Sequence, residues 1–114
     1  MTLNDLLQIK AQATRPLIVV HCGSTSKAQE AFEEYRLRDT LDGYIVLTIG
    51  ASKNDVSLGI TPAQATQLDI LHLFKIDLAD FVRVFNVGGY IGESTRRELE
   101  YAEALGKPVC FLEK

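Results

Sequence analysis

The sequence contains few of the residues that are typical of metal-binding, disulfide-rich or membrane proteins. Among its 114 residues are two cysteines, two histidines and no tryptophan. Cys22 and Cys110 are not spaced as metal ligands, so we expect reduced thiols, no metal and no cofactor. No apolar run approaches the roughly 18 residues of a transmembrane helix, and the first residues mix acidic and amide side chains with leucine, unlike a signal peptide. The expected location is the cytoplasm, with no membrane partner.

Positive charge is also scarce. Lysine and arginine total 12 against 15 aspartates and glutamates, which gives a net charge of -3. Proteins that bind nucleic acid neutralise phosphates with a basic face, and no such cluster is present, so no nucleic-acid partner is expected. A small phosphorylated ligand stays open, because helix N-termini and backbone amides bind phosphate without net positive charge.

What the chain does contain is a regular alternation of strands and helices. Its length is that of one domain, and we expect a single domain over residues 1–114. The order predicts an α/β, doubly wound (Rossmann/flavodoxin-like) fold, with four parallel strands in the order 2-1-3-4 behind a leading helix. An open sheet edge and an amphipathic leading helix favour a homodimer. Strands are predicted at residues 16–21, 44–48, 81–85 and 109–112, and helices at residues 2–13, 26–41, 61–78 and 95–105.

This strand order predicts where a ligand would bind. A switch point lies between the first and third strands, and ligands of such sheets bind outside the carboxyl ends of the strands at that point. The loops that reach this crevice are residues 21–26 and 86–94. A third loop, residues 49–60, is longer than most connections in compact α/β domains, and such loops are often functional.

The first crevice loop is His21-Cys-Gly-Ser-Thr-Ser26. Its amides and hydroxyls could hold a phosphate or a sugar hydroxyl at the start of the next helix. Alternatively, Gly23 makes the turn and one of the hydroxyl residues caps the helix. The loop lacks the Gly-Lys-Ser/Thr ending of a P-loop. A structural role is favoured for His21.

The second crevice loop carries three glycines, which let a backbone approach a ligand closely. Thr95 and Glu98 fit a capping box at the start of the following helix. Alternatively, Glu98 lies on the first helical turn and faces the crevice, where a carboxylate could attack an anomeric carbon or stabilise an oxocarbenium-like centre. The helix dipole would keep it ionised. Tyr90 could stack on a base or fill a dimer contact.

The second half of the chain combines several short motifs. Asp80 opens a strand, the loop Gly88-Gly-Tyr-Ile-Gly-Glu-Ser-Thr-Arg-Arg-Glu98 follows, and Gly106-Lys-Pro-Val109 closes the segment. This combination resembles the nucleoside 2-deoxyribosyltransferase family, whose relatives include the 2'-deoxynucleoside 5'-phosphate N-hydrolases. Cys22-Gly-Ser24 is similar to the hydrolase branch. The glycine pair and the Thr-x-x-Glu spacing are also similar to the cytokinin-activating phosphoribohydrolases.

The resemblance implies roles for individual residues. Glu98 matches the family's nucleophile, and Ser94 or Thr95 matches a ligand-binding hydroxyl. The family's catalytic aspartate falls near His72 here, with Asp69 one turn earlier and Asp77 one turn later. The implied ligand is a nucleoside or nucleotide.

Three functions are compatible with these residues. The first is cleavage or transfer at the N-glycosidic bond of a (deoxy)nucleoside 5'-monophosphate. The second is a non-catalytic nucleotide-binding module on the same fold, and the third is an interaction subunit in which Glu98 is only a helix cap. The candidate catalytic residues are Glu98 and His72, and the candidate substrate-binding residues are Cys22, Gly23, Ser24, Asn86, Gly88, Gly89, Tyr90, Ser94 and Thr95.

Overall fold

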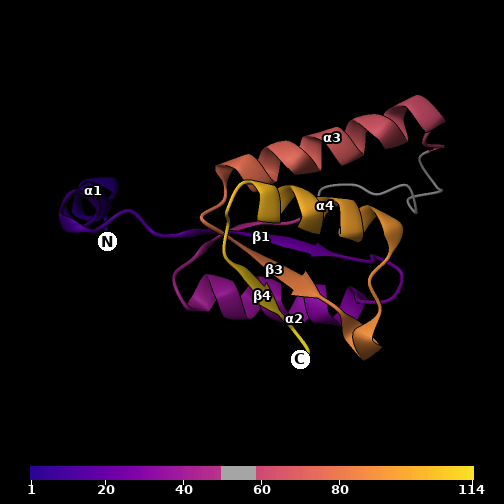
Figure 1. Cartoon of the computed structure of the whole chain (residues 1–114). Helices are drawn as coiled ribbons and strands as arrows, with labels where there is room; N and C mark the ends of the chain where they lie inside the picture. Colours follow the sequence, from indigo (N-terminus) through magenta and orange to yellow (C-terminus); the bar gives the residue numbers. More distant parts are fainter. Residues whose placement is uncertain (50–58) are drawn as a thin grey trace.

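The computed structural model describes residues 1–49 and 59–114, and its four-stranded sheet has the predicted topology (Figure 1). The strands are all parallel and lie in the order β2-β1-β3-β4, which confirms the predicted 2-1-3-4 arrangement. Most of the predicted loop at 49–60 falls at residues 50–58, outside the described residues. The strands are β1 (Ile18–Gly23), β2 (Ile45–Leu47), β3 (Phe81–Phe85) and β4 (Val109–Phe111).

Helices cover both faces of the sheet, as a doubly wound fold requires. In Figure 1, α3 and α4 lie on one face and α2 lies on the other, while α1 stands away from the body. No helix within the described residues has both the length and the apolar character needed to cross a membrane. The helices are α1 (Leu3–Gln12), α2 (Gln29–Leu41), α3 (Pro62–Leu78) and α4 (Glu93–Ala104), and a 3-10 turn spans Val87–Gly89.

Local signals explain the ends of two helices. Thr61 caps α3 through a reciprocal capping box with Gln64, and Pro62 takes the first helical position, as predicted. Gly106 follows α4 with a φ of 71°, a left-handed conformation that suits glycine. The start of α2 differs from the prediction. Ser24 accepts hydrogen bonds from the amides of residues 27 and 28, so a turn precedes the helix.

The start of α4 also differs, and this difference bears on function. The helix begins at Glu93 behind an N-cap at Gly92, two residues earlier than predicted. Thr95 and Glu98 therefore lie inside the helix, with Glu98 in its second turn, and the predicted capping box between them is wrong. A capping box needs a non-helical residue at its first position, and Gly92 occupies that position. Helix capping no longer accounts for Glu98.

Alternation along β1 sends neighbouring side chains to opposite faces of the sheet. Val20 and Cys22 face α3 and α4, where they pack in the main hydrophobic core with Val82 and Ile76. His21 faces α2, where its ring packs against neighbouring aromatic rings. Strand β1 thus places Cys22 in the core beneath α3 and α4, and His21 on the opposite face beneath α2.

Candidate functional site

A cavity of about 800 Å³ opens at the carboxyl end of β1, between α3 and the start of α4. This is the crevice that the sheet topology predicts, and its volume is within the range of small-molecule sites. The apolar part of the lining comes mainly from α3, through Leu68, Leu71, Phe74 and Leu78. The polar lining comprises Ser24, Thr25 and Ser26 after β1, Asp69, His72 and Lys75 on α3, and Glu93, Ser94, Thr95 and Glu98 on α4.

Three side chains from three elements meet at this cavity, where His72 and Glu98 belong to its lining. The Sγ of Cys22 on β1 lies 3.3 Å from the Nε2 of His72 on α3, a hydrogen-bonding contact. The same Nε2 lies 3.6 Å from the Oε2 of Glu98 on α4. All three residues are at most 9% exposed. The fold therefore brings together a thiol, an imidazole and a carboxyl group that are far apart in the sequence.

Glu98 is unusual among the acidic residues that the structure describes. Its Oε2 is buried and has no hydrogen-bond partner among the described residues. Burial, reinforced by the negative charge of Asp69, raises the pKa of Glu98 to about 8, although Arg97 acts in the opposite direction. The direction of this shift is opposite to the expectation that the helix dipole keeps Glu98 ionised.

His72 is shifted in the opposite direction. Burial, with a smaller effect from Lys75, lowers the pKa of His72 to about 4. At neutral pH the imidazole is therefore uncharged while Glu98 mostly keeps its proton, so the two form a neutral pair rather than an ion pair. Strongly perturbed groups that share a cavity are typical of functional sites.

The thiol completes a potential ligand set. Burial and the nearby carboxyl group of Glu98 raise the pKa of Cys22 well above its usual value. The ligand atoms of Cys22, His72 and Glu98 all lie within 4.8 Å of one another, close enough to hold a metal ion. Motif spacing could not indicate this group, because its members come from three separate elements.

Charged residues surround the opening of the cavity. Arg97 lies 3.3 Å from Asp69 and 3.4 Å from Glu93, so it links α3 to α4 at the rim. Asp69 lines the cavity one turn before His72, whereas Asp77 instead accepts a hydrogen bond of 2.6 Å from Tyr101. Asp69 was identifiable from its spacing to His72 on one helical face.

The predicted substrate-binding residues fall into two groups. Gly23, Ser24, Tyr90, Ser94 and Thr95 line the cavity together with both predicted catalytic residues. Gly23 also permits close packing, since a Cβ there would lie 3.1 Å from that of Phe85. Cys22 lies beneath the cavity floor.

The other group binds the carboxyl-terminal segment of the chain. The side-chain amide of Asn86 donates to the carbonyl of Glu113 and accepts from its backbone amide. The amide of Gly88 donates to the Glu113 carboxylate at 2.8 Å. Gly88 and Gly89, both with positive φ, form the 3-10 turn after β3. Asn86 and Gly88 thus bind Glu113, and Gly89 takes part only in the turn, while none of the three is among the residues that line the cavity.

Comparison of the chain with protein-family models, with curated proteins and with solved structures gives no match. The assignment of function therefore depends on the chemistry of the cavity and on the motif resemblance described above.

Proposed function

We propose that the cavity binds a nucleoside or a nucleoside 5'-monophosphate and that the protein hydrolyses its N-glycosidic bond. The observation that carries this proposal is the unpaired Oε2 of Glu98 at the cavity. A buried carboxyl oxygen without a partner is costly to the fold. A ligand whose anomeric carbon faces that oxygen gives it a chemical role, which agrees with the motif resemblance.

The cavity offers separate groups for the parts of such a ligand. Gly92 at the N-cap of α4 has no side chain to cover the first amides of the helix, and a helix N-terminus favours an anion such as a phosphate. Ser24 and Ser26, whose hydroxyls lie 3.1 Å apart, can hydrogen-bond a sugar or phosphate. Tyr90, half-exposed at the rim, can stack on a base.

The proposed reaction uses Glu98 and water. A carboxylate oxygen of Glu98 forms a bond to the anomeric carbon while the bond from that carbon to the base nitrogen breaks. The electron pair leaves with the base, which takes a proton from solvent. Water then cleaves the ester, releasing the free sugar or sugar phosphate and regenerating Glu98. His72 positions the carboxyl group from 3.6 Å and, being uncharged, does not hold it as an ion pair.

This mechanism predicts a specific pH dependence. Attack needs the ionised carboxylate, and burial raises the pKa of Glu98 to about 8. The value of kcat/KM reports groups of the free enzyme, so it should rise with pH and level off above about 8. A value of kcat/KM that falls through the same range would instead assign Glu98 as a general acid.

The test compares wild type with Glu98→Gln and with a matched control, Glu100→Gln, on the exposed side of the same helix. Melting temperatures are measured against a panel of nucleosides, deoxynucleotides and ribose phosphates, and base release is followed by chromatography. A ligand that binds the folded state raises the melting temperature. We expect one ligand class to stabilise all three proteins and base release from wild type and Glu100→Gln only.

Other outcomes assign other functions. A nucleotide that stabilises wild type without any base release makes the protein a binding module. Base release that is lost with a chelator and restored by Zn²⁺ would place a metal on Cys22, His72 and Glu98. If no member of the panel shifts the melting temperature, the nucleotide proposal is withdrawn.

A further inference from the structure

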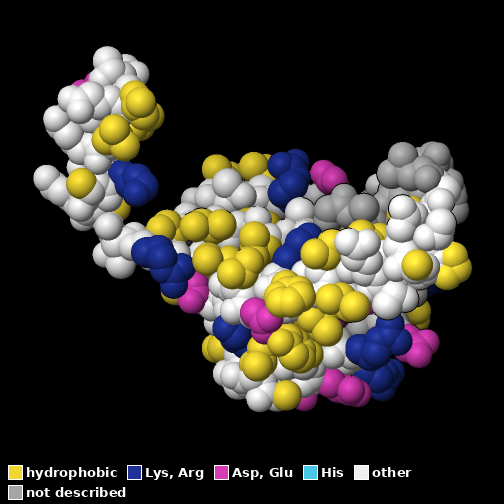
Figure 2. Space-filling view, turned by 90° about the horizontal axis from the view of Figure 1, so that it is seen from above, with side chains coloured by type: hydrophobic (Ala, Val, Ile, Leu, Met, Phe, Trp, Pro, Cys, Tyr) yellow, Lys and Arg dark blue, Asp and Glu magenta, His cyan; other side chains and the backbone are white. Residues whose placement is uncertain are grey.

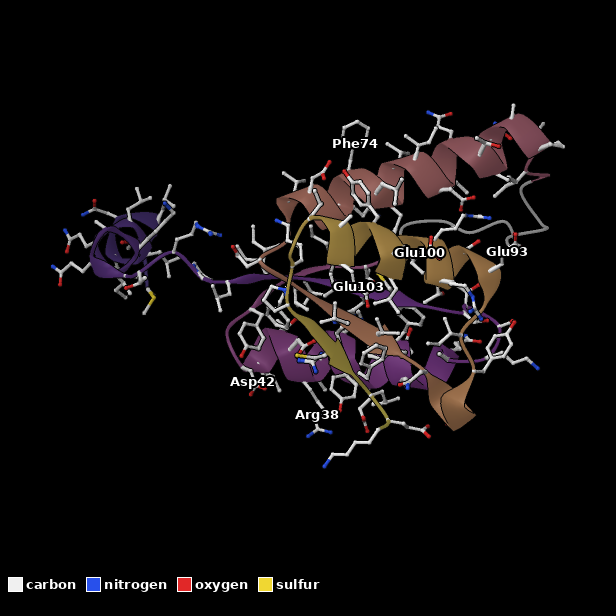
Figure 3. All side chains as sticks on the ribbon, viewed as in Figure 1. Arg38, Asp42, Phe74, Glu93, Glu100 and Glu103 are labelled. Carbon is white, nitrogen blue, oxygen red and sulfur yellow. The ribbon has the colours of Figure 1, made fainter. Side chains whose placement is uncertain are left out.

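Helix α3 is apolar on both of its faces. Its inner face packs Ile76 into the core. Its outer face carries four large apolar side chains that are 47–66% exposed: Ile70, Leu71, Phe74 and Leu78. Figure 3 shows Phe74 directed away from the sheet. A group of exposed large apolar side chains on one helix is typical of an interaction surface, so we expect the outer face of α3 to have a partner.

Helix α1 also has an exposed apolar side. It is ten residues long, none of which is buried in the described structure. Its apolar residues Leu3, Leu6 and Leu7 share one side of the helix and are 51–71% exposed. A capping box between Thr2 and Asp5 fixes its start. An isolated helix of this length is marginal in water, so α1 needs a packing partner to be stable.

The segment that follows α1 is joined to the body of its own chain at Asp80. Arg15 makes two hydrogen bonds of 3.2 and 3.3 Å to the carboxylate of Asp80, and that carboxylate also accepts from the amide of Ile18 at 2.7 Å. Figure 2 shows α1 projecting from the body with its own group of apolar side chains, separate from those on the face above α3. One chain thus carries two apolar helix faces that do not meet each other.

We propose that a second copy of this chain covers the outer face of α3 with its α1, and that the exchange is reciprocal. In such a two-fold dimer, each protomer gives one α1 and receives one. Residues Leu71, Phe74 and Leu78 follow one another at spacings of three and four, which is the pattern that accepts an apolar helix. The occupant is therefore a segment of matching chemistry that every copy already presents.

The symmetry also doubles the area of the interface. A stable interface needs roughly 800 Å² from each partner. This is about a tenth of the 7788 Å² surface of one chain. A single contact between a ten-residue helix and one face is small for that purpose. Two-fold exchange doubles it, because both apolar faces of each chain are covered at once.

The same interface would wall the candidate site. Leu71, Phe74 and Leu78 are among the residues that line the cavity. An α1 from the partner lying along these residues would close that side of the cavity. The ligand site would then be complete only in the dimer, although dimerisation itself does not depend on the proposed hydrolase function.

Analytical ultracentrifugation of the full chain tests the exchange. We expect wild type to be a dimer at tens of micromolar, and Leu7→Glu on α1 and Phe74→Lys on α3 each to be monomeric. Leu41→Glu, on α2 and 75% exposed, is the matched control and should remain dimeric. Circular dichroism confirms that each variant is folded.

Mixing the two monomeric variants is the decisive step. A mixed pair contains one unaltered contact between α1 and α3, and in its other contact the new Glu faces the new Lys. We therefore expect equimolar Leu7→Glu and Phe74→Lys to re-form a dimer that neither makes alone. The proposal is overturned if wild type is monomeric, if Leu7→Glu stays dimeric, if Leu41→Glu dissociates, or if the mixture remains monomeric. Because mass is measured without ligand, these outcomes are independent of the hydrolase test.

Discussion

Two buried carboxyl groups, on helices that cover opposite faces of the sheet, differ in their hydrogen bonding. Asp39 on α2 is 1% exposed, and Glu98 on α4 is 9% exposed. Asp39 accepts hydrogen bonds from His21 at 2.8 Å and from Arg83 at 2.8 and 2.9 Å. Glu98 has an oxygen with no hydrogen-bond partner in the part of the chain that is described.

The difference separates a structural acid from a candidate functional one. The guanidinium of Arg83 donates two hydrogen bonds to Asp39, one to each carboxylate oxygen. This bidentate geometry compensates well for the hydration that a buried carboxylate loses. Burial lowers the pKa of His21 in spite of Asp39, so the imidazole tends to be neutral and the charge balance lies between Asp39 and Arg83. The Oε2 of Glu98 has no hydrogen-bonded cation among the described residues, and burial raises the pKa of Glu98. A buried acid that the fold leaves unpaired is available to a ligand.

Removing the paired acid should have the largest effect on stability. Asp39→Ala leaves Arg83 and His21 without their partner, and breaking a buried ion pair from one side costs about 3–5 kcal/mol. Urea unfolding should show that loss at pH 7. Asp42→Ala, an exposed acid at the end of α2, should change the free energy of unfolding by less than about 0.5 kcal/mol. A loss below about 1 kcal/mol for Asp39→Ala would remove the distinction drawn between the two acids.

Glu98 should instead make the free energy of unfolding fall as pH rises. Its pKa is about 8 in the folded chain against an ordinary 4.5, so between these values the folded state holds a proton that the unfolded state has released. Stability from Glu98 is therefore lost as pH rises toward and through 8. The loss between pH 6.5 and 8.5 should be about 1–2 kcal/mol.

His72 shifts the curve in the opposite direction, in a window that overlaps that of Glu98 between pH 4.5 and 6.5, and removing the Glu98 carboxylate separates the two effects. Its pKa is about 4 in the folded chain against 6.5, so the unfolded state binds the extra proton and stability falls as pH drops from 6.5 to 4. Urea unfolding of Glu98→Gln should lose the alkaline decline, and its acid decline should be steeper than that of wild type, because Glu98 no longer offsets His72 between pH 4.5 and 6.5. A Glu98→Gln curve that still declines above pH 6.5 would assign the decline to another group.

The fold was predictable from the sequence because its signals are local. Apolar runs, the Thr61-Pro62 start and the Gly106 stop each act within a few residues, and the chain order then fixes the sheet topology. The start of α4 was misplaced because two N-terminal signals compete there. Thr95 with Glu98 fits a capping box, but Gly92 already supplies the N-cap.

The candidate site was only partly predictable. The switch point indicated the right crevice and the motif indicated Glu98. The pairing of Cys22, His72 and Glu98 depends on the depth and rotation of two helices on the sheet, which no local pattern specifies. Asn86 illustrates the converse, since a polar residue in a crevice loop binds the backbone of Glu113, a contact made across many residues.

The smallest change in stability among these buried polar residues should come from replacing Cys22, next to His21 in β1. A thiol is a weak hydrogen-bond donor, and a buried cysteine behaves as a small apolar residue, so Cys22→Ala should cost only about 1 kcal/mol. Burial is the main cause of the raised pKa of Glu98, so the alkaline decline in stability should persist in this variant.

Cys22 is buried and its thiol pKa is raised, so in wild type a thiol reagent at pH 7.5 should modify the exposed Cys110 first and Cys22 only on unfolding. If Cys22→Ala keeps ligand binding but abolishes base release, the thiol belongs with Glu98 among the reacting groups.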